Sequence, residues 1–317
     1  MSQFTNETSP LGDSSRYEKG STVDMTTDSD LSSDISSLNR EQSRSLGDFE
    51  IMGVIGHGKF STVFRAKSKA TGEVVALKKV QIFEIMDSRT RNDCINEVKI
   101  LQSLDHPNII KYQDSFMEEN ELIIVLQLAE EGDLGRILQG KQGQGEQLDQ
   151  MQALQYFVQV CDALQHMHER RMMHRDIKPS NVFITADGKL KLGDLGLSRY
   201  FSSKTAQAQS MVGTPYYMSP ECIRGQPYDW KSDVWSLGCL LYEMITLRGP
   251  FFRDGLNYYT LGKLISKCEY EPLPDYVMGE LRELVSRMIQ GAPDQRPSVS
   301  EVAGMAYAAL GKLQVEA

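Results

Sequence analysis

The most constraining feature of the sequence is an apolar run, DVWSLGCLLYEMIT, at residues 233–246. Read at helical spacing, this run is apolar on almost every side, and such a helix has to be enclosed by other helices. A second segment, MQALQYFVQVCDALQHMH at residues 151–168, has its apolar positions on one side only and is typical of an amphipathic helix. The C-terminal part of the chain is therefore predicted to form a large helical lobe.

The part before it has a different pattern. Four stretches rich in β-branched and apolar residues are expected to be strands, at residues 49–56, 61–68, 74–80 and 121–129. A helix is expected over residues 88–104, where Ile95, Val98, Leu101 and Leu104 recur at helical spacing. The prediction is an α+β chain with two lobes: a small β-rich lobe at 46–128 and a helical lobe at 129–311, joined near residues 127–132, with a short tail at 312–317.

Length and composition exclude several classes of protein. The chain has 317 residues, which suits two lobes that share a cleft, and its net charge of −9 argues against general nucleic-acid binding. It has no apolar run near the ~20 residues of a membrane span, and no secretory leader is expected. Its five cysteines include no CxxC pair, so neither a disulfide framework nor a zinc site is expected, and a cytoplasmic location is predicted.

Residues 1–45 differ in composition from the rest of the chain. About 17 of these residues are serine or threonine, and the apolar residues among them show no lasting period. Such a segment cannot bury enough apolar surface to offset the entropy lost on ordering. We expect a disordered tail, which serves either as a docking or phosphorylated segment or as a solvated leader without a specific role.

A glycine-rich stretch, IGHGKFSTV at residues 55–63, joins the first two expected strands. Glycines allow backbone N–H groups to approach phosphate closely, although a plain hairpin turn has the same composition. Gly53, Gly58 and Lys59 also fit part of a P-loop, but Phe60 stands where that motif needs Ser or Thr, and a strand follows instead of a helix. The remaining functional interpretation is a β-hairpin flap over a nucleotide, of the G-x-G-x-x-G-x-V type, with Ser61 at the third glycine position.

Further motifs follow in a fixed order. They are Val75-Ala76-Leu77-Lys78 on the third strand, Glu97 on the next helix, His174-Arg175-Asp176 with Asn181, Asp194-Leu195-Gly196, and Ser219-Pro220-Glu221. This ordered set resembles that of a protein kinase. Over residues 46–310 the sequence is similar to the NIMA-related (Nek) serine/threonine kinases, and it resembles their short six/seven subgroup most; serine at position 61 and leucine at 195 are usual there.

The resemblance implies ATP and Mg²⁺ as cofactors and a role for each motif residue. Lys78, held by Glu97, would bind the α- and β-phosphates, while Asn181 and Asp194 would hold the metal ion. Asp176 would accept the proton of the substrate hydroxyl, and Lys178 would contact the γ-phosphate. The residues placed around ATP are Ile55, Gly56, His57, Gly58, Lys59, Phe60, Ser61, Thr62, Val63, Ala76, Lys78, Glu97, Gln127, Ala129 and Phe183.

Neighbouring residues have simpler interpretations. Strand alternation turns Lys79 away from Lys78, so a solvated surface lysine is expected there. His166, His168 and His174 do not share one helix face, which argues against a metal site. The resemblance places Tyr112 in a column with Leu101, His174 and Leu195 that allows the helix bearing Glu97 to lock inward.

The resemblance also predicts regulation. Arg175 needs an anion, which a phosphorylated activation segment usually supplies in this family. Ser210 matches the activating phosphosite of the subgroup, and Thr214 is expected to hydrogen-bond Lys178 and Asp176.

Two functions are carried forward: an active serine/threonine kinase, and a kinase-fold scaffold with little activity. The presence of Lys78, Asp176 and Asp194 favours the enzyme. Family inheritance adds protein substrates, a larger NIMA-related kinase as activator, microtubule-associated partners, and cell-cycle or cilia signalling at centrosomes, spindles or other microtubule structures.

Overall fold

The computed structural model describes residues 44–58, 61–82, 98, 101–194 and 215–316. At its N-terminal end a short 3₁₀ turn, Leu46–Asp48, leads into a five-stranded antiparallel sheet with the order β1-β2-β3-β5-β4. The strands are β1 Phe49–His57, β2 Ser61–Ser68, β3 Val74–Val80, β4 Tyr112–Glu118 and β5 Glu121–Gln127. Four of them were expected from the sequence. Strand β4 was not, because only Tyr112, Phe116 and Met117 in it are large and apolar.

Strand alternation divides the sheet into two apolar faces. On one face Val75 and Leu77 of β3 pack with Ile123 and Val125 of β5 and with Phe116 of β4 in a small separate core. On the other face Leu122 and Ile124 belong to the main core, which continues into the helical lobe. The sheet therefore keeps one face for its own core and turns the other toward the rest of the molecule.

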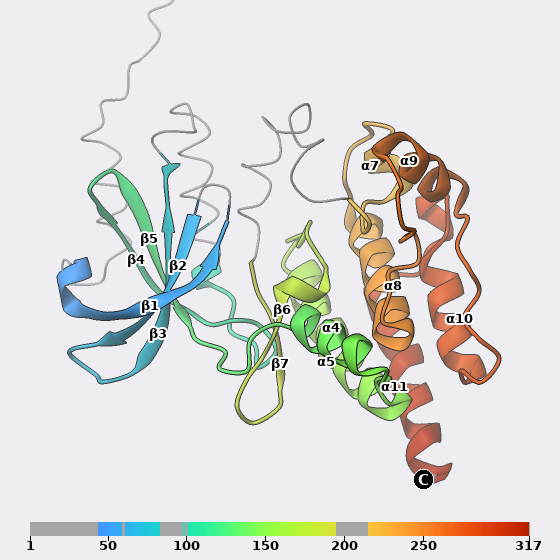
Figure 1. The fold of residues 1–317 in the computed structure, drawn as a ribbon, viewed down its shortest axis with the longest axis horizontal. Coiled ribbons are helices and arrows are strands. Elements are labelled where there is room, and N and C mark those ends of the chain that lie inside the picture. Colours follow the sequence, from blue (N-terminus) through green and yellow to red (C-terminus); the bar gives the residue numbers. More distant parts are fainter. Residues whose placement is uncertain (1–43, 59–60, 83–97, 99–100, 195–214, 317) are drawn as a thin grey trace, which may run out of the picture.

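Helix α8, Trp230–Thr246, forms the centre of the helical lobe, and 13 of its 17 residues are buried. This confirms the prediction drawn from its apolar sequence. Its N-terminus is capped by Asp229, whose carboxylate accepts from the backbone N–H groups of Lys231 and Ser232. Helix α5, Gln150–Glu169, packs against α8 and against α11, Val299–Glu316, so α8 lies inside a layer of helices (Figure 1).

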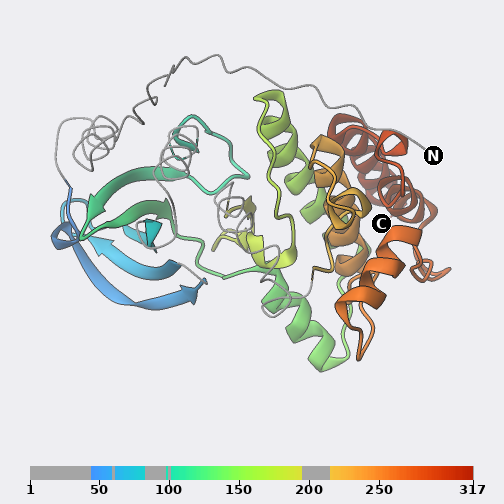
Figure 2. The same ribbon diagram turned by 90° about the horizontal axis from the view of Figure 1, so that it is seen from above.

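The other helices surround this centre, as the view from above shows (Figure 2). They are α4 Leu134–Gln144, α7 Pro220–Ile223, α9 Tyr258–Lys267 and α10 Gly279–Met288, with 3₁₀ turns at Pro179–Asn181 and Pro293–Gln295. Helix α11 continues past residue 311, where the sequence analysis ends the catalytic domain, because Leu313 still packs partly against the core.

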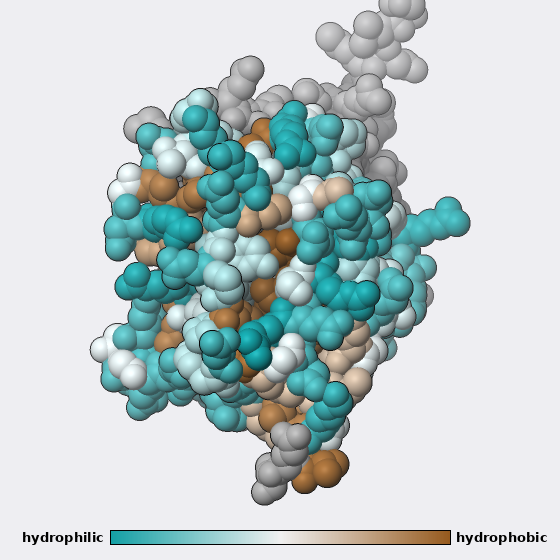
Figure 3. All heavy atoms as spheres, turned by 90° about the vertical axis from the view of Figure 1, so that its right-hand side faces the viewer, coloured by the Kyte–Doolittle hydropathy of each residue, from teal (hydrophilic) through white to brown (hydrophobic). Residues whose placement is uncertain are grey.

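The outer face of the helical lobe is largely hydrophilic, with narrow apolar patches between polar side chains (Figure 3). Among the helices of the described residues, none combines the length and the apolar character that crossing a membrane requires.

Within the described part of the chain, two sets of backbone hydrogen bonds connect the sheet to the helical lobe. The first is the strand-to-helix segment after β5, which pairs with β6, Val182–Ile184, through Glu131 N–H to Ile184 O at 3.0 Å and Ile184 N–H to Gly132 O at 2.9 Å. The second is the loop before β4, where Ile110 N–H donates to the carbonyl of Leu192 at 2.9 Å. Leu192 ends β7, Leu190–Leu192, so this loop extends the small β6–β7 sheet. Both connections lie beside the cleft between the lobes.

Candidate active site between the lobes

A cavity of about 550 Å³ separates the sheet from the helical lobe. Its lining includes Ile55, Val63 and Ala76 from the sheet and Phe183 of β6. Of the residues predicted to surround ATP, the cavity contains Ile55, Gly56, His57, Gly58, Ser61, Val63, Ala76, Lys78, Gln127, Ala129 and Phe183. The predicted nucleotide site is therefore one continuous space.

One predicted residue does not line the cavity, and several cannot be located. Thr62 lies next to Val63 on β2, where strand alternation turns the two side chains to opposite faces, and its contact with ATP stays a prediction. Five predicted site residues lie outside the described residues, as does Leu195 of the proposed column. These five are Lys59, Phe60, Glu97, Ser210 and Thr214.

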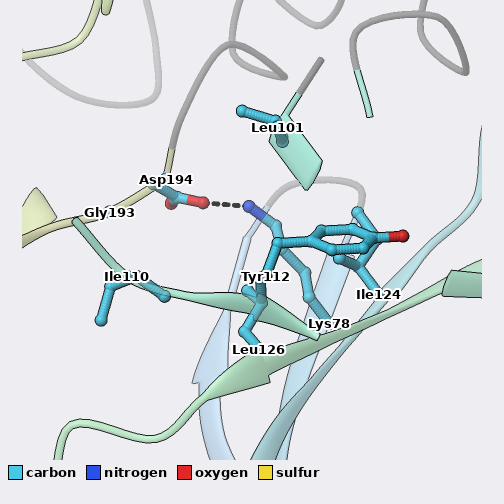
Figure 4. A pocket seen from close by; sticks show the side chains of 8 residues that line it. All are labelled: Lys78, Leu101, Ile110, Tyr112, Ile124, Leu126, Gly193 and Asp194. Atoms are coloured by element: carbon cyan, nitrogen blue, oxygen red, sulfur yellow. Dashed lines mark hydrogen bonds and ion pairs between the residues drawn. The ribbon is translucent and has the colours of Figure 1, made fainter. Parts of the chain in front are cut away.

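The inner end of the cavity holds an ion pair between Lys78 and Asp194 (Figure 4). Lys78 is only 9% exposed, so its ammonium needs a negative partner. Burial raises the pKa of the Asp194 carboxyl, but the Lys78 ammonium outweighs burial and the pKa lies below its ordinary value. Asp194 is therefore ionised at neutral pH and available to a cation.

The metal-binding prediction fits the residues present. Asn181 and Asp194 both line the cavity, and amide and carboxylate oxygens are the ligands that Mg²⁺ prefers. Mg²⁺ commonly takes one or two protein ligands and completes its shell with phosphate oxygens and water. Two side chains beside a phosphate-sized space match that pattern, whereas no cluster of three or more His, Cys, Asp or Glu side chains suited to a metal occurs in the described ranges.

The loop from His174 to Asn181 brings three predicted residues together. The Oδ2 of Asp176 accepts from the ammonium of Lys178 at 2.7 Å and from the amide of Asn181 at 2.8 Å. The same amide also donates to the backbone carbonyl of Asp176 at 2.7 Å. These bonds fix a carboxylate, an amine and an amide on one short loop facing the cavity, as the spacing of the motif predicts.

His174 connects this loop to Asp194. Its ring is fully buried, and burial lowers the pKa of the imidazole, so the ring is neutral. Its Nδ1 lies 3.3 Å from the N–H of Asp176, which donates to it, and its Nε2 lies 3.0 Å from the carbonyl of Gly193. Since Nδ1 accepts, Nε2 carries the proton and donates to Gly193. His174 therefore ties the backbone of Asp176 to the backbone next to Asp194.

Asp233 is a functional residue that the sequence analysis missed. It is completely buried in α8, and its two oxygens accept from the backbone N–H groups of His174 and Arg175, each at 2.9 Å. The side chain of His168 lies 2.8 Å from Oδ2, and the Tyr228 hydroxyl donates to Oδ1. Burial would raise the pKa of this carboxyl, but the bonds from His168 and Tyr228 hold it below its ordinary value. An acid in the first turn of a helix that is otherwise mostly apolar and buried is the signal that could have indicated it.

Arg296 was also missed. Its guanidinium makes two parallel hydrogen bonds of 2.8 Å to the carboxylate of Glu221, and both side chains are buried. Glu221 belongs to the predicted Ser219-Pro220-Glu221 motif, but 75 residues separate it from Arg296. Sequence spacing offers no signal for so distant a pair.

The predictions for Lys79 and for Tyr112 can also be compared with the structure. Lys79 lies on the face opposite Lys78, as predicted, but it is not freely solvated, because it pairs with Glu121 at 2.5 Å. Tyr112 and Leu101 line one small cavity beside Lys78, and the Tyr112 hydroxyl points away from Asp194 and accepts from Gln102 at 3.2 Å (Figure 4). Burial raises the pKa of Tyr112 to about 12, so its phenol stays protonated.

Arg175 has a buried Nε without a hydrogen-bond partner among the residues that the structure describes. A buried guanidinium nitrogen in this state is costly. This observation is consistent with the prediction that Arg175 needs an anion.

Comparisons with known proteins agree with this geometry. A family model described as "Protein kinase domain" matches residues 49–308. A probable serine/threonine-protein kinase nek3 from Dictyostelium discoideum is 39% identical over 80% of this chain and 23% of its own length, and the serine/threonine-protein kinase Nek1 from Mus musculus is 39% identical over 78% and 20%. The serine/threonine-protein kinase nekl-2 from Caenorhabditis elegans is 36% identical over 81% of this chain and 73% of its own length. The chain thus spans less than a quarter of the first two relatives and about three-quarters of the third.

Proposed function

Because the chain belongs to the protein kinase family, in its NIMA-related branch, we propose that it transfers the γ-phosphoryl group of ATP to serine and threonine hydroxyls of protein substrates. One observation carries the proposal. Lys78, Lys178, Asn181 and Asp194 meet in one cavity beneath the glycine-rich hairpin, and Asp176 is bonded directly to two of them.

The roles of the side chains follow from their chemistry. Asp176 is the proton acceptor for the substrate hydroxyl, and its bonds to Lys178 and Asn181 hold the carboxylate in a fixed orientation. Lys178 and Lys78 place positive charge where negative charge develops on the phosphoryl oxygens. Asn181 and Asp194 would hold Mg²⁺, which when bound neutralises phosphate charge. Ion pairing with Asp194 keeps Lys78 inside the cavity, where ATP phosphates would compete for it.

Regulation and cellular role belong to the same proposal. Phosphorylation of Ser210 activates the enzyme by supplying an anion to Arg175, whose buried Nε supports this idea. A larger NIMA-related kinase is the proposed activator, and the small cavity beside Tyr112 and Leu101 is a second point of control. Family inheritance alone supports microtubule-associated substrates, cell-cycle or cilia signalling, and a place at centrosomes or spindles, whereas the scattered cysteines support a cytoplasmic location.

The test is phosphate transfer from Mg·ATP to a generic serine- and threonine-containing protein, with and without prior phosphorylation by a NIMA-related kinase. Asp176→Asn is expected to lower transfer by about 10²-fold or more. Lys78→Met is expected to weaken ATP binding in calorimetry. Lys79→Met is the matched control, since Lys79 lies on the same strand but pairs with Glu121 outside the cavity. If the wild-type protein binds ATP but transfers no phosphate even after phosphorylation, the kinase proposal is wrong and the scaffold is favoured.

A further inference from the structure

Tyr228 lies in the segment between α7 and α8, and none of the catalytic motifs includes a residue of this segment. Its ring is partly buried, and its hydroxyl donates to the Oδ1 of Asp233. Burial and the neighbouring carboxylate raise the pKa of this phenol well above its ordinary value, so the hydroxyl keeps its proton. Tyr228 is therefore a permanent donor to a carboxylate that also binds the catalytic loop.

The four donors to Asp233 are arranged in two pairs. Oδ2 accepts from the backbone N–H of His174 and interacts with the ring of His168. Oδ1 accepts from the backbone N–H of Arg175 and from the hydroxyl of Tyr228. Each oxygen thus has one bond from the catalytic loop and one from a side chain outside it. Tyr228 and the backbone of Arg175 therefore donate to the same oxygen, Oδ1 of Asp233.

Arg175 is the strained residue of this loop. Its φ of 69° lies in the left-handed region, which a non-glycine residue adopts only at a cost in free energy. Two successive N–H groups that point at one carboxylate form a local anion-binding turn. The hydrogen bonds that these two N–H groups donate to Asp233 therefore stabilise a backbone conformation that Arg175 would otherwise avoid. Asp176 follows directly, so this conformation also determines where its carboxylate lies.

We propose that Tyr228 is a positioning residue for phosphoryl transfer, because its hydroxyl orients the Asp233 oxygen that holds Arg175 and so fixes the carboxylate of Asp176. This inference rests on the proposed kinase function. Without the hydroxyl, Oδ1 keeps a single donor and the carboxylate can rotate toward His168. The catalytic loop would then sample conformations in which Asp176 is displaced from the substrate hydroxyl, while the ATP cavity is unchanged.

Tyr228→Phe is the test, because it removes the hydroxyl and keeps the ring. The matched control is Tyr242→Phe, since Tyr242 lies on the same helix as Asp233 but donates to the carbonyl of Glu271 at 3.0 Å. A hydrogen bond to a charged group is among the stronger ones, so losing it is expected to lower kcat by about tenfold or more. The KM and Kd for ATP are expected to stay within about twofold of wild type, because no residue that lines the cavity changes.

A second measurement does not depend on activity. Amide hydrogen exchange at His174 and Arg175 is expected to be faster in Tyr228→Phe and unchanged in Tyr242→Phe, with both variants compared at equal global stability. The inference is overturned if an active wild-type protein and Tyr228→Phe have the same kcat, if both variants lose activity equally, or if exchange at both amides is unchanged. If the wild type transfers no phosphate, the proposed function fails, and the exchange rates alone decide whether Tyr228 holds the loop.

Discussion

Replacement of Arg296 by methionine removes one half of a buried ion pair in the helical lobe. The guanidinium donates twice to Glu221 at 2.8 Å, and it also donates to the backbone carbonyls of Gln290 at 2.8 Å and Lys231 at 2.9 Å. Methionine fills a similar volume but donates to none of these acceptors. The carboxylate of Glu221 would remain buried with the Ser232 hydroxyl, at 2.6 Å, as its strongest remaining donor.

Two estimates of the free energy of unfolding that this pair contributes agree. Removing one member of a buried ion pair typically costs 3–5 kcal/mol, because the other charge stays desolvated. For the wild type, burial raises the pKa of Glu221, but hydrogen bonds outweigh burial, the bond from Arg296 first and those from Ser232 and Ser219 after it, and the pKa falls from 4.5 to about 2. A depression of that size contributes about 3 kcal/mol of stability at neutral pH. We therefore expect Arg296→Met to lose about 3–5 kcal/mol in the free energy of unfolding.

The stability lost in Arg296→Met is also expected to depend on pH. In the wild type the folded pKa of Glu221 lies below its unfolded value, so the stabilisation is present above pH 4.5 and is lost as the pH falls toward 2. In the variant the buried, unpaired carboxyl titrates above its unfolded pKa, so the variant gains stability as the pH falls from neutral. The difference in the free energy of unfolding between wild type and variant is therefore largest near pH 7 and is smaller at pH 5.

Urea unfolding followed by tryptophan fluorescence measures this difference, and Trp235 lies directly beneath Arg296 at 5.1 Å. Arg282→Met is the matched control, since Arg282 pairs at 3.0 Å with Asp275, whose side chain is fully exposed, and no measurable change is expected there. A loss below about 1 kcal/mol for Arg296→Met, an equal loss in the control, or a difference that does not vary with pH would refute the reasoning.

Three glycine positions give further predictions. Gly238→Ala in α8 is expected to destabilise the fold by about 1–3 kcal/mol, because the new Cβ would lie 2.8 Å from the Cβ of Met288. Gly304→Ala in α11 is expected to stabilise the fold by up to about 1 kcal/mol, because nothing lies within 4 Å of the new Cβ. Chemical denaturation of both variants compares the two effects. Gly193→Ala is expected to weaken ATP binding in calorimetry, because its Cβ would lie 2.8 Å from the ring of Phe183 and displace the floor of the cavity; an unchanged Kd would contradict this.

The local parts of the fold and site could be predicted from the sequence. The apolar run that becomes α8 and the loop from His174 to Asn181 depend on residues close together in the chain, and both have the predicted form. Strand β4 was missed because its apolar residues do not alternate in the usual way. A motif gives positions, whereas strand alternation determines which side chains face the cavity, so the motif could not show that the side chain of Thr62 lies outside its lining.

Long-range partners could not be predicted. Asp233 lies 59 residues beyond His174, and Arg296 lies 75 residues beyond Glu221, whereas Tyr228 lies five residues before Asp233. The side chains of Asp233 and Arg296 act through contacts that exist only after the helices have packed. The sequence shows the cost of such a residue, a charge among apolar neighbours, but it does not show which distant donor offsets that cost.

The two connections between the lobes also limit how the cleft can open. One lies after β5, where residues 131–132 pair with β6, and the other lies at Ile110, which pairs with Leu192. A body attached to another at two separate points retains one rotational degree of freedom, about the line through those points. Swinging of the sheet about this line would open the cleft without breaking either set of backbone hydrogen bonds, and the ion pair between Lys78 and Asp194 would separate as it opened. The two attachment points would then define a hinge axis between the sheet and the helical lobe.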